Sequence, residues 1–99
     1  MQFLEPWYVP RDLTVLDAQL ASELSPGHAL FGIPVRALAR RQDRDDVLFE
    51  LLDSSSRVAV VHLTHSVNVS PAWPSTEFFP NLSAWQSERM APDVAEFNA

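Results

Sequence analysis

The chain has 99 residues, 46% of them hydrophobic, and this length fits a single domain over residues 1–99. It contains no cysteine, which excludes disulfide bonds and thiol nucleophiles and fits a cytoplasmic location. The net charge of −6 disfavours binding to the phosphates of nucleic acids, and no apolar run approaches the roughly 20 residues of a membrane span, so we expect no nucleic acid and no membrane as partner.

The first predicted element is an amphipathic helix over residues 12–24. Leucines recur there at three- and four-residue spacing with polar residues between them, at Leu13, Leu16, Leu20 and Leu24. The tripeptide Ser25-Pro26-Gly27 then ends the helix.

Three strands are predicted next, over residues 34–41, 47–52 and 58–64. The first has a composition that also favours a helix, and this alternative stays open, but Gly32 and Pro34 before it favour a strand that completes a meander. Residues 58–64 are rich in valine and apolar on both faces, so we expect this strand to be central and covered on both sides.

The last predicted elements are a short edge strand over residues 76–79 and a helix over residues 82–90, capped by Asn81 and ended by Pro92. The expected fold is therefore α+β: an antiparallel three- to four-stranded meander with an N-terminal and a C-terminal helix packed on one face. A second copy of the chain is one way to cover the other face, so a homodimer stays open.

Three segments carry a resemblance to a known family: residues 30–35 (LFGIPV), 45–51 (DDVLFEL) and 59–64 (AVVHLT), followed later by Trp73-Pro74. Together they resemble a small family of uncharacterised bacterial proteins, and this resemblance implies no activity. The family has Trp where this chain has His65, so the resemblance gives His65 no shared role.

The three histidines are candidate metal ligands. His62 and His65 are three residues apart, however, and an odd separation on a strand points their side chains to opposite faces. We therefore predict no metal site, with His62 in the sheet and both His28 and His65 on the surface.

The residue types of a hydrolytic Ser-His-Asp triad are present in residues 54–56 (three serines), His62 and Asp53. No nucleophile elbow surrounds these serines, which have the composition of a turn. The two glycines, Gly27 and Gly32, cannot build a phosphate-binding loop. The sequence thus predicts no catalytic residue and no cofactor.

Charged and aromatic side chains are the remaining candidates for a binding surface. Residues 40–46 alternate in sign at a predicted turn, which is either a solvated turn or a polar recognition patch. Trp73 stands between prolines in a loop, where an aromatic side chain can anchor a partner. The candidate partner-binding residues are Arg36, Arg40, Asp46, His62 and Trp73.

These observations favour a small, soluble, non-enzymatic binding or regulatory protein. Its acidity suits the neutralisation of a basic protein partner, as an immunity protein neutralises a toxin. The alternative is a small enzyme or ligand-binding domain with a pocket around His62, Arg36 and Asp46.

Overall fold

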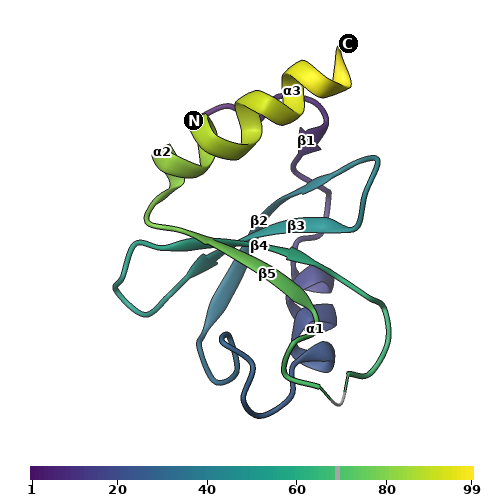
Figure 1. Cartoon of the computed structure of the whole chain (residues 1–99), viewed down its shortest axis with the longest axis vertical. Coiled ribbons are helices and arrows are strands. Elements are labelled where there is room, and N and C mark those ends of the chain that lie inside the picture. Colours follow the sequence, from purple (N-terminus) through teal and green to yellow (C-terminus); the bar gives the residue numbers. More distant parts are fainter. Residues whose placement is uncertain (69) are drawn as a thin grey trace.

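The computed structural model describes residues 1–68 and 70–99 and contains one antiparallel sheet of five strands that follow one another in chain order (Figure 1). The strands are β1 (Trp7–Tyr8), β2 (Val35–Arg41), β3 (Asp46–Leu51), β4 (Val58–His62) and β5 (Ser75–Phe79). The predicted α+β class and meander are confirmed. The predicted number of three to four strands is wrong, because the N-terminal segment adds β1 as a further edge strand.

Residues 34–41 form a strand and not the alternative helix. Their segment β2 pairs with β1 on one side and with β3 on the other. The register with β3 shifts between Ala37 and Ala39, and the Ala37 N–H donates to the Asp17 carboxylate at 2.7 Å. Pairing on both sides outweighs the helix propensity of this stretch.

The two helical regions lie on opposite faces of the sheet, so their predicted packing on one face is wrong. Helix α1 (Thr14–Glu23) covers one face. The C-terminal segment, made of α2 (Leu82–Trp85), the π-helical turn η1 (Gln86–Met90) and α3 (Ala91–Phe97), covers the other and lies well apart from α1 in Figure 1. A sheet with two apolar faces needs a cover on each of them.

Strand β4 shows the physical reason for this arrangement. Val58 and Val60 belong to the apolar layer beneath the C-terminal segment, whereas Ala59 and Val61 belong to the layer beneath α1. The predicted coverage of this strand on both sides is confirmed. The predicted central position is only approximate. β4 is an interior strand that pairs with β3 and β5, but the middle strand of the five is β3.

The C-terminal segment begins where it is predicted to begin and continues further. The Asn81 side chain caps its start by accepting the Ala84 N–H at 2.8 Å. Pro92 does not end the helix. It lies in the first turn of α3, directly after the π-helical turn, and the helix continues to Phe97. No helix in the described part of the chain is both long and apolar enough to cross a membrane.

Candidate functional site

Asp46 and His62 meet at one end of the sheet. They are paired residues of β3 and β4, and the His62 Nδ1 lies 2.7 Å from the Asp46 Oδ1. His62 lies in the sheet as predicted, and Asp46 is its hydrogen-bond partner. Asp46 is buried, whereas 53% of the His62 side chain is exposed.

Arg89 of η1 binds the other oxygen of Asp46. Its Nη2 lies 2.6 Å from the Asp46 Oδ2, while its Nε donates to Asp93 at 2.9 Å. A third carboxylate, that of Glu77, lies 3.7 Å from the Arg89 Nη1. One guanidinium therefore links η1 and α3 to two strands.

Arg41, at the end of β2, is completely buried and extends this linkage. Its guanidinium donates two hydrogen bonds to Asp43, at 2.9 and 3.0 Å, and its Nη1 lies 3.2 Å from Asp93. Burial opposes its charge, but the hydrogen bonds to Asp43 and the charge of Asp93 outweigh this and raise the pKa of Arg41. The same hydrogen bonds lower the pKa of Asp43.

Asp93 also accepts the indole N–H of Trp7 at 2.9 Å. It thus joins β1, β2 and the C-terminal segment through one buried carboxylate. We name the connected set the ion-pair chain: Arg41, Asp93, Arg89, Asp46 and His62. Sequence reasoning missed Arg41, Arg89 and Asp93 as a group, and the only local signal was the four-residue spacing of Arg89 and Asp93.

The five candidate partner-binding residues do not gather at one site. Arg36 lies near the opposite end of the sheet, where it pairs with Glu50 at 2.7 Å. Arg40 lies 3.8 Å from Asp45, and Trp73, half exposed, lies in the loop before β5. Only Asp46 and His62 are in contact, so the pocket predicted around His62, Arg36 and Asp46 lacks its arginine.

The histidines have separate partners. His28 is buried, and its Nε2 lies 2.9 Å from the Pro74 carbonyl oxygen, so its predicted place on the surface is wrong. The Leu30 N–H donates to its other ring nitrogen at 2.9 Å. His65 is exposed as predicted and lies 3.3 Å from Asp45.

Glu23 connects the end of α1 to the loop that follows β4. Its buried carboxylate accepts the backbone N–H groups of Thr64 and His65 at 2.7 and 2.9 Å, the Thr64 hydroxyl at 2.7 Å and the Gln19 amide at 2.7 Å. Burial alone raises the pKa of Glu23, but these hydrogen bonds outweigh it, and the pKa lies below its ordinary value of 4.5.

This carboxylate makes the fold sensitive to acid. Because the folded state lowers the pKa of Glu23, the stabilisation is present above the unfolded pKa and is lost as the pH falls through the folded pKa. We expect Glu23→Gln to lower the free energy of unfolding by about 1–3 kcal/mol near neutral pH. The difference from the parent chain should shrink as the pH falls from neutral to values at which the folded carboxyl group is protonated.

Urea denaturation of both chains across this pH range measures the effect. Glu88→Gln is the matched control, since Glu88 is exposed and forms no ion pair with any described residue. A destabilisation by Glu23→Gln that stays constant over the whole range would contradict the assigned role.

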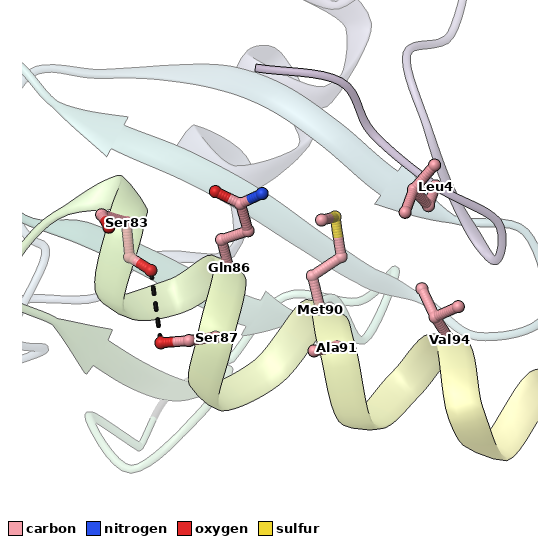
Figure 2. Close-up of a pocket in the computed structure, with 7 residues that line it drawn as sticks. All are labelled: Leu4, Ser83, Gln86, Ser87, Met90, Ala91 and Val94. Atoms are coloured by element: carbon pink, nitrogen blue, oxygen red, sulfur yellow. Dashed lines mark hydrogen bonds between the residues drawn. The ribbon is translucent and has the colours of Figure 1, made fainter.

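A groove runs along the C-terminal segment (Figure 2). It has a volume of about 460 Å³, and Leu4 faces Met90 and Val94 across it, with Ser83 and Ser87 at one end. A second hollow lies between α1 and the segment before β2. Both are lined by residues other than those of the ion-pair chain.

Comparison of the chain with protein-family models, with curated proteins and with solved structures finds no match. The family resemblance of the three sequence segments therefore stays a prediction.

Proposed function

We propose that the chain is a small non-enzymatic binding protein and that its partner is a basic protein, which it neutralises in the manner of an immunity protein. One observation carries the proposal: most of the arginine side chains form ion pairs with carboxylates of the same chain. Six of the seven arginines lie 2.6 to 3.8 Å from a carboxylate of the same chain: Arg36, Arg40, Arg41, Arg44, Arg57 and Arg89.

The carboxylates outnumber the arginines by 13 to 7, so the excess charge on the chain is negative. Several carboxylates that pair with arginines still face solvent, among them Glu77 at 60% and Glu96 at 61% exposure of the side chain. A negative surface attracts a basic partner and accelerates its association. It also repels phosphates, which supports the expectation that nucleic acid is not the partner. The lack of cysteine supports the cytoplasm as the place where the chain binds its partner.

A capture experiment tests this function. The tagged chain is incubated with host proteins separated beforehand into basic and acidic fractions by ion exchange. We expect it to retain one discrete protein from the basic fraction and to release it as the salt concentration rises, because surface charge attraction is screened by salt.

An unrelated acidic protein of similar size and charge is the control for non-specific attraction. Retention from the acidic fraction only, retention that the control protein reproduces, or no retention at all would contradict a basic partner.

The alternative is a small enzyme or ligand-binding domain centred on His62, and the contact between His62 and Asp46 favours it. The Nδ1 of His62 is bound to the carboxylate, which leaves the Nε2 for a ligand, and Arg89 supplies the positive charge that Arg36 does not. His62→Ala separates the two functions. It would abolish ligand turnover or binding in the alternative, whereas in the main proposal the negative surface would still retain the basic protein after the loss of one of its candidate partner-binding residues.

A further inference from the structure

Strand β5 is an edge strand of the sheet, with His28 next to its first residues, close to Pro74 and the Thr76 hydroxyl. It pairs with β4 on one side, and it is the last strand in the order β1 to β5. Figure 1 shows it at the margin of the sheet. A strand edge exposes backbone N–H and C=O groups that can pair with another strand.

The hydrogen bonds of β4 reveal which groups of β5 point outward. Directly after β4, the Leu63 N–H donates to the Asp45 carbonyl at 3.0 Å. The backbone N–H and C=O groups of the odd-numbered residues of β4 therefore point toward β3. Since bonding alternates along an antiparallel strand, Val60 bonds toward β5, where its partner is Glu77. The neighbours of Glu77, Thr76 and Phe78, therefore direct their N–H and C=O groups away from the sheet.

These outward groups have no backbone partner among residues 1–68 and 70–99. Thr76 and Phe78 thus offer two donors and two acceptors, spaced as an added strand requires. Pro74 and Pro80 border β5 and have no N–H, which limits the usable edge to the five residues of the strand.

Glu77 lies between the two outward-facing residues, with 60% of its side chain exposed. On an added strand, the residue opposite Glu77 forms a non-hydrogen-bonded pair, in which the side chains of the two strands are closest. A Lys or Arg at that position would form an ion pair with Glu77.

A second copy of this chain fits the edge poorly. The antiparallel pairing that uses all five residues of β5 places Glu77 opposite Glu77 of the other copy. Like charges directly opposite each other destabilise a strand pair, and each copy carries a net charge of −6.

We propose that the outer edge of β5 is the docking site for an extended segment of a basic partner protein, which adds a sixth strand and places a Lys or Arg opposite Glu77. The proposal rests on the proposed function for the charge of the partner. The geometry of the edge is independent of it.

Two short synthetic peptides of alternating Thr and Val, one with a central Lys and one with a central Glu, are the probes. Amide NMR spectra of the intact chain are recorded as each peptide is added. We expect the Lys peptide to shift the amide signals of Thr76 and Phe78 and to bind about three- to tenfold more tightly than the Glu peptide.

Four variants sharpen the test. Glu77→Lys should reverse the preference between the peptides, and Glu5→Lys, the same charge change before β1 at the opposite edge, should not. Thr76→Pro should weaken both peptides far more than Thr76→Val does, because proline removes an outward N–H and valine keeps it.

Each outcome decides the proposal. Shifts that avoid β5, or an unreversed preference in a folded Glu77→Lys chain, would overturn it. Concentration-dependent shifts of Thr76 and Phe78 without peptide would identify a second copy as the occupant and overturn it too. Capture of a basic protein whose binding survives Thr76→Pro would overturn docking on β5 and leave the proposed function intact.

Discussion

Replacing Asp93 with Ala is expected to lower the free energy of unfolding by about 3–5 kcal/mol. Asp93 is buried, accepts hydrogen bonds from Trp7 and Arg89 and faces the completely buried guanidinium of Arg41 at 3.2 Å. Without its carboxylate, Arg41 keeps Asp43 as its one ion-pair partner among residues 1–68 and 70–99, and the buried Trp7 N–H loses its acceptor. Since small domains are stable by about 5–15 kcal/mol, a loss of this size should leave the chain marginally folded.

Urea denaturation followed by tryptophan fluorescence measures this loss. Glu96→Ala on the same helix is the matched control, because Glu96 forms an exposed ion pair with Arg44 that should contribute at most about 1 kcal/mol. Asp93→Asn should fall between the two, since an amide oxygen can still accept the Trp7 N–H. Equal effects of Asp93→Ala and Glu96→Ala would refute the structural role of the ion-pair chain.

A second large effect is expected at Trp85, which anchors the C-terminal segment. Its ring is completely buried, with its centroid 5.1 Å from that of Trp7 in an edge-on arrangement and 5.8 Å from that of Phe3. Trp85→Ala should cost about 3–5 kcal/mol, because it removes buried apolar surface and leaves a cavity.

Trp85→Phe should cost clearly less. The indole N–H of Trp85 is buried and has no hydrogen-bond partner within the described residues, so its removal relieves an unsatisfied polar group while most of the apolar ring is kept. The same denaturation experiment compares the two variants. A Phe variant as unstable as the Ala variant would show that the indole N–H contributes a favourable interaction.

Local patterns in the sequence predicted most of the secondary structure. Helix α1, strand β4 and the Asn81 cap each depend on residues close together in the chain, namely leucine spacing, a run of valines and a capping side chain. Strand β1 could not be predicted in this way, since its two residues are too few to show a periodicity. Residues 34–41 form a strand and not a helix because β2 pairs with β1 and with β3. These partners lie outside the segment, so its own composition does not reveal them.

The placement of the helices on the two faces of the sheet and the grouping of the site residues depend on contacts between residues far apart in the sequence, which local patterns do not reveal. The apolar residues on both faces of β4 indicated two covers, yet they did not assign a helix to each face. Asp46 and His62 meet because the register of two strands pairs them, and Arg89 reaches Asp46 from 43 residues along the chain. The candidate residue Arg36 was wrongly grouped with them, because position along a strand is not visible before the register is known.

The division of the apolar residues into two layers has a consequence for how the chain tolerates change. The sheet lies between the layer beneath α1 and the layer beneath the C-terminal segment, and helical side chains from the two sides do not share a cluster. Substitutions in Leu20 and in Trp85 therefore have no common neighbours in the helices, and their energetic costs should be close to additive. Each side of the protein can accumulate substitutions largely independently, whereas strands β2, β3, β4 and β5 contribute residues to both layers.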